Sequence, residues 1–137
     1  MSRQMSPYLN FDGNCREAMN FYKECLDGDL TVQTAGESPI ADQMLPALKD
    51  SVMHSSLTTK DGMVFMGSDM HRGKLIEGNT VHICINCSSE EEINSLFNNL
   101  SRGGNITEPL AVMFWGGLYG SLTDKFGKQW VFNYQKN

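Results

Sequence analysis

The two halves of the chain predict the same order of elements, and this repetition constrains the fold more than any single motif does. Each half predicts a strand, a helix and three further strands, read from where apolar residues alternate or recur with helical spacing. The strands predicted in the first half are 8–11, 30–34, 52–59 and 63–68. Those predicted in the second half are 81–87, 106–110, 118–123 and 129–134.

One such βαβββ unit cannot cover both faces of its own sheet, whereas two units can share a larger sheet and a core. The predicted fold class is therefore α+β, with paired βαβββ modules forming a curved mixed sheet. We expect the helices on its convex face and a cup on its concave face. At 137 residues, the chain suits one domain over 1–137, with module one at about 7–70 and module two at about 80–135.

Capping signals bound the helix of the first half. Asn14 followed by Glu17 is typical of a capping box, and Gly28 is expected to end the helix as its left-handed residue. The apolar residues that predict its buried face are Ala18, Phe21, Tyr22, Cys25 and Leu26.

The helix of the second half has a similar signal. Ser88 and Ser89 offer N-caps, and Glu91 and Glu92 follow three residues after them. Its predicted buried face is Ile93, Leu96, Phe97 and Leu100. We also expect Phe21, Tyr22, Phe97, Trp130 and Phe132 to be core residues.

Turn residues separate the remaining strands. Asp61-Gly62 predicts one hairpin, and residues 124–127 predict another, with Gly127 available for a positive φ. Residues 35–51 form a long predicted loop, which could hold a short helix at 41–49 and act as a lid. Residues 69–79 predict a polar connector, and we expect its His71 to be solvated.

Composition narrows the classes of partner. The net charge of −5 argues against non-specific binding to nucleic acid or to anionic membranes. No apolar run reaches the length of a spanning helix or a signal peptide, so we expect a cytoplasmic protein with reduced thiols. Cys84 and Cys87 have the spacing of a redox or zinc motif. On a strand, residues three apart face opposite ways, so they are interpreted as packing thiols.

Two sequence blocks carry a family resemblance. The first is residues 7–14 with 18–22, which include Pro7-Tyr8-Leu9-Asn10-Phe11. The second is residues 114–120 with 124–130, which include Phe114-Trp115-Gly116-Gly117. With these blocks the chain resembles the vicinal oxygen chelate superfamily of glyoxalase I and bleomycin-resistance proteins, in its PhnB-like branch, often labelled 3-demethylubiquinone methyltransferase-like. The resemblance implies paired modules, a ligand cup and a homodimer.

The resemblance also implies where a metal would bind. Enzymes of the superfamily usually hold one divalent metal through His, Glu or Gln on four strands. Counting along the repeat places those positions at Tyr8, His82, Met66 and Val131. Tyr8 is a poor ligand, and Met66 and Val131 cannot hold a hard or borderline cation. No cofactor is therefore expected, although His54, His82 and Cys84 could make an unorthodox metal site.

The candidate ligand-binding residues are those that strand alternation directs into the cup, together with the aromatic residues of the glycine-rich loop. For the histidines, the alternative is a hydrogen-bonded role without chemistry. For the loop aromatics, it is a filled cup or a dimer interface. The candidates are Tyr8, Asn10, His54, His82, Trp115 and Tyr119.

These residues lead to a small-molecule binding protein without the usual metal site, a role for which the bleomycin-resistance proteins are precedents. One alternative is a metal-dependent lyase, isomerase or transferase that uses His82 and His54. Another is a dimeric protein-interaction module whose cup is filled by its own side chains. Methyl transfer is not expected, because no strand–glycine loop–helix site for an adenosyl cofactor is evident. No catalytic residue is assigned.

Overall fold

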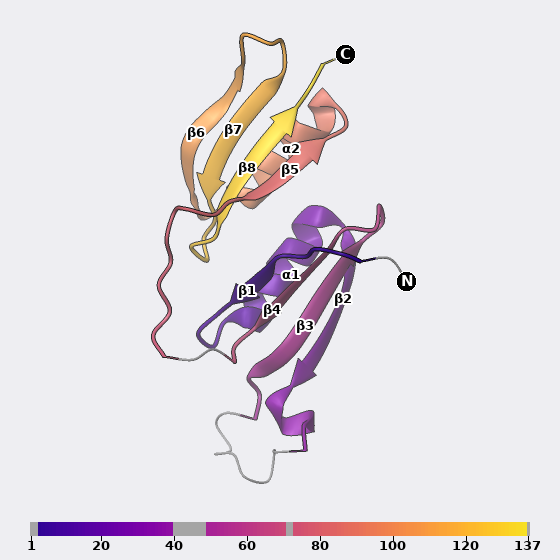
Figure 1. The fold of residues 1–137 in the computed structure, drawn as a ribbon, viewed down its shortest axis with the longest axis vertical. Helices are drawn as coiled ribbons and strands as arrows, with labels where there is room; N and C mark the ends of the chain where they lie inside the picture. Colours follow the sequence, from indigo (N-terminus) through magenta and orange to yellow (C-terminus); the bar gives the residue numbers. More distant parts are fainter. Residues whose placement is uncertain (1–2, 40–48, 71–72, 137) are drawn as a thin grey trace. The chain divides into compact units, whose positions relative to one another are not determined.

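The computed structural model describes residues 3–39, 49–70 and 73–136. The chain divides into two compact units, Met1–Ile76 and Glu77–Asn137. Each unit is one βαβββ module with its own four-stranded mixed sheet, so the predicted α+β class and the paired modules are confirmed (Figure 1). The predicted helix at 41–49 and the predicted role of His71 lie outside the described residues.

In the first unit, one helix covers one face of the sheet (Figure 1). The strand order is β1-β4-β3-β2; β1 runs parallel to β4, and the other neighbours are antiparallel. The elements are β1 (Tyr8–Asn10), α1 (Cys15–Leu26), β2 (Gly28–Thr34), the 3₁₀ helix η1 (Ala35–Glu37), β3 (Val52–Thr59) and β4 (Val64–Ser68).

The second unit repeats this arrangement, with strand order β5-β8-β7-β6 and a parallel β5–β8 pair. Its last hairpin has the predicted bounds, with Gly127 at φ 87° and its amide bonded to the Asp124 carbonyl at 2.9 Å. The elements are β5 (Ile83–Cys87), α2 (Glu90–Leu100), β6 (Asn105–Val112), β7 (Leu118–Thr123) and β8 (Gln129–Tyr134).

The first strand of the second unit starts later than predicted. Val81 and His82 precede β5, and the Val81 side chain is 79% exposed instead of facing the helix. The neighbouring β8 starts only at Gln129, because Lys128 belongs to the turn: its carbonyl accepts a hydrogen bond from the Asp124 amide at 2.8 Å, and its amide donates to the Asp124 carboxylate at 3.1 Å. Residues 81 and 82 therefore have no strand partner.

The ends of α1 also differ from the prediction. Asn14 precedes the helix without a side-chain cap, and the Asp69 carboxylate instead accepts hydrogen bonds from the amides of Gly13 (2.9 Å) and Cys15 (3.0 Å). The left-handed residue at the end of the helix is Asp27, at φ 54°, and not Gly28. Gly28 already belongs to β2, where a Cβ atom would lie 2.7 Å from the Thr58 carbonyl oxygen.

The cap of α2 is confirmed. The Ser89 hydroxyl accepts a hydrogen bond from the Glu92 amide at 3.0 Å, and the Glu92 carboxylate accepts one from the Ser88 amide at 2.9 Å. This exchange satisfies two amide donors at the start of the helix, as in a capping box. Glu90, Glu91 and Glu92 place negative charge in its first turn.

Each unit has its own core between the helix and the sheet. Gly67 on β4 allows α1 to approach, because a Cβ atom there would lie 3.0 Å from Met19 Sδ and 3.3 Å from Cys15 Sγ. In the second unit Phe97 of α2 meets Phe132 edge to face at 5.3 Å. All five predicted core aromatics are buried: Phe21, Tyr22, Phe97, Trp130 and Phe132.

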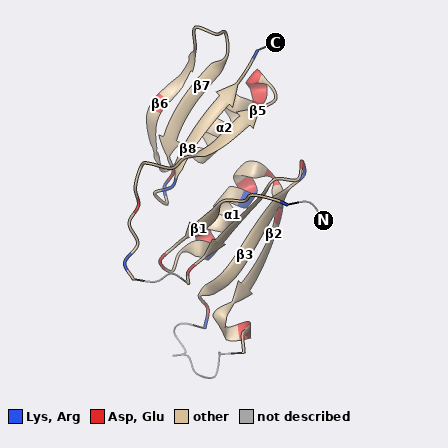
Figure 2. Cartoon of the chain, viewed as in Figure 1, with Lys and Arg blue, Asp and Glu red and all other residues tan. Residues whose placement is uncertain are grey.

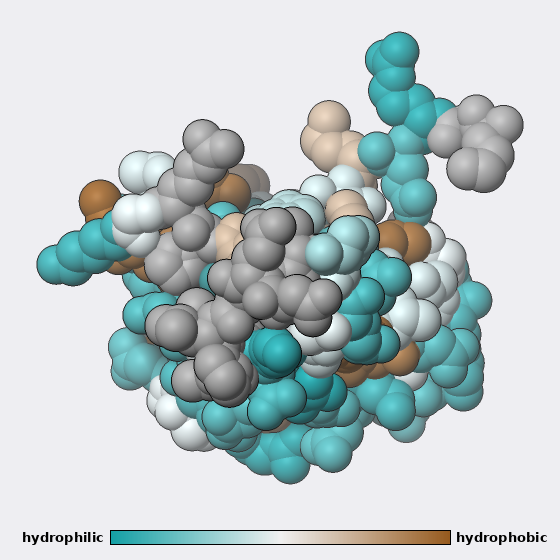
Figure 3. Space-filling model, turned by 90° about the horizontal axis from the view of Figure 1, so that it is seen from below, coloured by the Kyte–Doolittle hydropathy of each residue, from teal (hydrophilic) through white to brown (hydrophobic). Residues whose placement is uncertain are grey.

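The surface drawn in Figure 3 is mostly hydrophilic, with hydrophobic residues in separate small patches. Met5, Ile76 and Phe114 are among the exposed large hydrophobic residues. In the part of the chain that the structure describes, neither helix is long and apolar enough to cross a membrane. All four cysteines are free thiols.

Candidate functional site

The face of the first sheet that lies opposite α1 is called here the first open face. On β3, Ser55, Leu57 and Thr59 are buried toward α1, whereas His54 and Ser56 alternate with them and face the other way. The register places Tyr8 beside Met66, and Met66 beside Ser56. Tyr8, Met66 and Ser56 therefore form a row across three neighbouring strands of this face.

The first open face brings together two of the predicted site residues. The rings of Tyr8 and His54 are stacked, with centroids 6.2 Å apart and planes inclined by 30°. Tyr8 is 49% exposed and His54 is half-buried. Asn10 lies on β1 two residues after Tyr8 and therefore on the same face. A phenol, an imidazole and an amide there offer a ring surface and hydrogen-bonding groups of both kinds.

The corresponding face of the second sheet, opposite α2, is called here the second open face. Tyr119 pairs with Asn133 across β7 and β8, and the Asn133 side-chain amide donates a hydrogen bond to the Asn86 side-chain oxygen at 3.2 Å. Tyr119 is half-buried, as is Asn133. The structure thus places the predicted residue Tyr119 on a polar row of this face.

Trp115 lies at the tip of the β6–β7 hairpin and not on a strand. The Met113 amide donates to the Gly117 carbonyl at 2.8 Å, which closes the turn, and Gly116 has φ 90°. Trp115 is 43% exposed and meets the almost fully exposed ring of Phe114 edge to face at 5.0 Å. A Cβ atom at Gly117 would collide with the Tyr134 carbonyl oxygen and lie 2.7 Å from the Trp115 indole nitrogen, so this glycine allows both the end of β8 and the indole to lie close to the backbone.

The register corrects the predicted match of Tyr8 with His82. His82 is exposed and lies before β5, and the β5 residue that pairs with Val131 is Cys84. In the first sheet the equivalent pair is Tyr8 with Met66. The four positions that correspond in the two sheets are therefore Tyr8, Met66, Cys84 and Val131.

These four residues do not fit the divalent metal that the family resemblance implies. A thioether and an aliphatic side chain occupy two of the positions, and neither suits a hard or borderline cation. Within each unit, the described residues hold no group of three His, Cys, Asp or Glu side chains that could bind a metal ion.

Cys84 and Cys87 point to opposite faces of β5, as predicted, but only Cys87 is a packing thiol. Cys84 is exposed on the second open face, whereas Cys87 is 8% exposed beneath α2. Burial, with a smaller contribution from the Glu92 carboxylate, raises the pKa of the Cys87 thiol to about 12. The Cys87 thiol is therefore protonated near neutral pH and a poor nucleophile.

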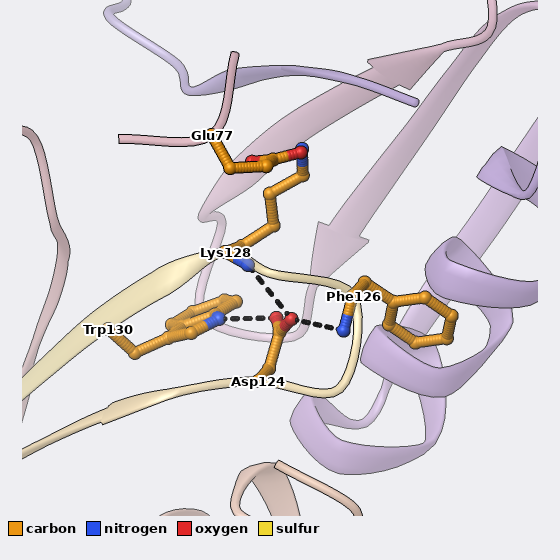
Figure 4. Close-up of polar contacts among 5 residues, drawn as sticks. All are labelled: Glu77, Asp124, Phe126, Lys128 and Trp130. Carbon is orange, nitrogen blue, oxygen red and sulfur yellow. Dashed lines mark hydrogen bonds and ion pairs between the residues drawn. The ribbon is translucent and has the colours of Figure 1, made fainter. Parts of the chain in front are cut away.

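Asp124, predicted as a turn residue, has a further structural role. Its carboxylate accepts hydrogen bonds from the Trp130 indole at 2.7 Å and from the amides of Phe126 at 2.8 Å and Lys128 at 3.1 Å (Figure 4). Lys128 also forms an ion pair with Glu77 at 2.8 Å. This network joins the turn, β8 and the start of the unit.

The sequence reasoning missed a polar cluster on β6 and β7. The Ser121 hydroxyl lies 2.7 Å from the Thr107 hydroxyl and donates to the Glu108 carboxylate at 3.1 Å. The sequence did contain a signal for this cluster: Glu108 is the one charged residue in the strand predicted at 106–110.

Comparison with known proteins identifies relatives over nearly the full chain. The family model described as 3-demethylubiquinone-9 3-methyltransferase matches residues 3–132. Protein YjdN from Escherichia coli (strain K12) is 28% identical over 141 residues, which cover 96% of this chain and 95% of that protein.

Solved structures give the same result. Protein PA1353 from Pseudomonas aeruginosa is 37% identical, with a TM-score of 0.84 over 99% of this chain and 100% of its own. A putative 3-demethylubiquinone-9 3-methyltransferase, PhnB protein, from Bacillus cereus is 28% identical, with a TM-score of 0.75 over 96% and 99% of the two chains. In fold alone, the chain is similar to a glyoxylase/bleomycin resistance protein/dioxygenase domain from Frankia (14% identity, TM-score 0.69, 99% of both chains).

Proposed function

This chain belongs to the 3-demethylubiquinone-9 3-methyltransferase family, a PhnB-like group within the glyoxalase/bleomycin resistance superfamily, and from that premise we propose that it binds a small molecule on its open faces. The proposed contacts are the residues predicted from the sequence without His82, because His82 precedes its strand instead of lying on it. The proposal does not use the family's usual metal site.

The observation that carries the proposal is the stacked pair of Tyr8 and His54 on the first open face. An aromatic side chain that is half exposed leaves apolar surface in water, which a ligand can cover favourably. Asn10 and Ser56 add polar groups to the same face, and polar groups beside an apolar surface can orient a ligand. The pair therefore supports binding of a compound with a flat apolar part and hydrogen-bonding groups.

A thermal unfolding screen tests the proposal. Hydrophobic, aromatic and cationic compounds are added singly to the full chain, and a compound present at a hundredfold excess over its Kd should stabilise the protein by about 2.7 kcal/mol. Each stabilising compound is then tested on the double variant Tyr8→Ala with His54→Ala. The proposal predicts that the stabilisation falls at least severalfold in that variant.

The matched control is Ile76→Ala, which removes an exposed apolar side chain outside the sheet. This variant should keep the full ligand response. Equal stabilisation of the double variant and the wild type would exclude the first open face as the binding surface. A screen in which no compound stabilises the wild type would count against a small-molecule role.

We further propose that the chain forms a homodimer, as its relationship to the superfamily suggests. Light scattering coupled to size-exclusion chromatography should then give about twice the chain mass of 15.3 kDa. A mass equal to one chain across the micromolar range would contradict this proposal.

A further inference from the structure

Glu108 is the one charged side chain in the four strands of the second sheet, all of which the structure describes. Figure 2 shows the strands almost free of charged residues, with most charges on helices, turns and the connector. A carboxylate side chain is costly to bury, and glutamate contributes little to the stability of strand pairing. Its presence on β6 therefore suggests a role other than packing.

A local irregularity of β6 places this carboxylate. The β6–β7 register shifts both before and after Glu108, between Ile106 and Glu108 and between Glu108 and Ala111. Consecutive residues of a regular strand face opposite sides, yet Thr107 and Glu108 both contact the Ser121 hydroxyl, at 2.7 and 3.1 Å. Bulges redirect side chains in this way and are frequent beside functional sites.

Ser121 identifies the face on which the cluster lies. Its neighbours Gly120 and Leu122 face α2: a Cβ atom at Gly120 would lie 2.9 Å from the Phe97 ring, and Leu122 is fully buried. Ser121 therefore points to the second open face, together with Tyr119 two residues earlier. Ser121 is 4% exposed, whereas Glu108 is exposed. One carboxylate oxygen is thus fixed by a buried hydroxyl, while the group stays accessible to a ligand.

The internal repeat provides a comparison for this position. Ser56 and Ser121 each lie six residues before the glycine of their hairpin, Gly62 and Gly127. The edge-strand residue paired with Ser56 is Thr31, whereas the one paired with Ser121 is Glu108. The first sheet forms the same strand pairing without a carboxylate, so the architecture does not require one at this position.

We propose that Glu108 is the anchoring carboxylate of a subsite for a protonated amine on the second open face. The inference rests on the proposed small-molecule function and specifies its ligand class: an organic cation with a primary ammonium group and an apolar or aromatic body. The ammonium donates a charge-assisted hydrogen bond to the Glu108 carboxylate. The half-buried ring of Tyr119, on the same face, provides the surface for the ligand body.

The test compares two probes of similar shape, benzylamine and benzyl alcohol, by backbone amide NMR titration of the full chain. In the wild type, benzylamine should shift the amide signals of Ser121 and Tyr119 in a saturable way. Glu108→Gln should weaken benzylamine binding by roughly tenfold, the loss expected for one charge-assisted hydrogen bond. It should leave the response to benzyl alcohol unchanged.

Asp29→Asn is the matched control, because Asp29 is an exposed carboxylate on β2, the edge strand of the first sheet. This variant should bind benzylamine as the wild type does. Ser121→Ala keeps the charge but removes the hydroxyl that fixes it, so it should weaken benzylamine binding by a smaller factor. It provides the comparison if Glu108→Gln does not fold.

Equal benzylamine affinity of Glu108→Gln and the wild type would overturn the inference. If either probe still bound to an open face of both proteins, the proposed small-molecule function would remain supported although the role of Glu108 would be excluded. If benzylamine did not shift the wild-type signals at millimolar concentration, the inference would also be overturned. The separate compound screen would still decide whether the protein binds any small molecule.

Discussion

At the residue scale, the two aspartates that follow strands have different structural roles. Asp124 lies in a turn but accepts three hydrogen bonds while only 3% exposed, so it connects the turn to the Trp130 side chain. Asp69 accepts hydrogen bonds from three amides far along the chain, those of Gly13, Cys15 and Val52. A buried donor that loses its acceptor is costly, so both side chains matter for folding.

Asp124→Asn should destabilise the protein. The substituted side chain presents one NH₂ group where a carboxylate oxygen now accepts a hydrogen bond, so one of the three donors loses its partner. The expected cost is about 1.5–3 kcal/mol, the range for hydrogen bonds to charged groups. Urea unfolding followed by tryptophan fluorescence measures it. Asp29→Asn, an exposed carboxylate in the first sheet, should change stability by less than about 0.5 kcal/mol.

Cys87 predicts an alkaline loss of stability. Its pKa is raised from 9.0 to about 12 in the folded protein, so above pH 9 the unfolded chain releases a proton that the folded chain keeps. Stability should therefore fall as pH rises from 9 to 12, by up to about 1.4 kcal/mol per pH unit.

Urea unfolding at pH 8 and pH 10.5 tests this expectation. Cys87→Ala should remove that part of the alkaline loss, and Cys84→Ala, at the exposed thiol, should retain it. The same pH dependence in the wild type and Cys87→Ala would show that other groups are responsible.

At the scale of the elements, the two helices begin in different ways. α2 is capped by its own neighbours, Ser89 and Glu92, whereas the residue before α1, Asn14, makes no side-chain cap. The acceptor for α1 comes instead from Asp69, at the end of β4. The start of α1 therefore forms only when the strands around it are in place, while α2 can begin from local contacts.

Asp69→Ala should consequently cost more than Asn14→Ala. Removing the Asp69 carboxylate leaves three amides without this acceptor, with an expected loss of about 2–3 kcal/mol, whereas Asn14→Ala should lose less than about 1 kcal/mol. Thermal unfolding monitored by circular dichroism compares the two variants. A larger effect of Asn14→Ala would show that its side chain caps the helix in solution.

Much of the fold could be predicted from local patterns, since strong alternation and an Asp-Gly turn determine a hairpin. β3, β7 and β8 have the predicted bounds. The failures arose from long-range contacts. β5 starts late because the turn at Asp124 limits its partner strand, and Gly28 is needed for close approach to Thr58. At the site, alternation placed Tyr8 and His54 on one face, whereas Tyr119 was a candidate as an aromatic residue of the glycine-rich loop and lies on β7. Neither pattern could anticipate a bulge that redirects Glu108.

At the scale of the whole molecule, the chain consists of two units that each bury their own core. Between β4 and β5, the described residues 73–82 form neither helix nor strand. Within this segment, Glu77 is paired with Lys128, whereas Lys74 is exposed. A segment without regular structure is a preferred site for proteolysis.

A lysine-specific protease should therefore cleave after Lys74 before it cleaves after Lys23 in α1 or after Lys128 beside β8, which is buried and paired with Glu77. Mass spectrometry of the first fragments measures the order. Lys74→Gln should slow the formation of the two unit-sized fragments, whereas Lys23→Gln should not affect it. Early cleavage after Lys23 would mean that α1 opens more readily than the connector.

The arrangement of the cysteines has a practical consequence. Three thiols, those of Cys15, Cys25 and Cys87, are buried, and only that of Cys84 is exposed. A fluorinated alkylating reagent should therefore attach at one position of the natural sequence, on the second open face beside Val131. The ¹⁹F resonance of that tag would report on ligands near Tyr119 and Glu108 without any engineered mutation, which makes this protein suited to fluorine-detected screening of unlabelled mixtures.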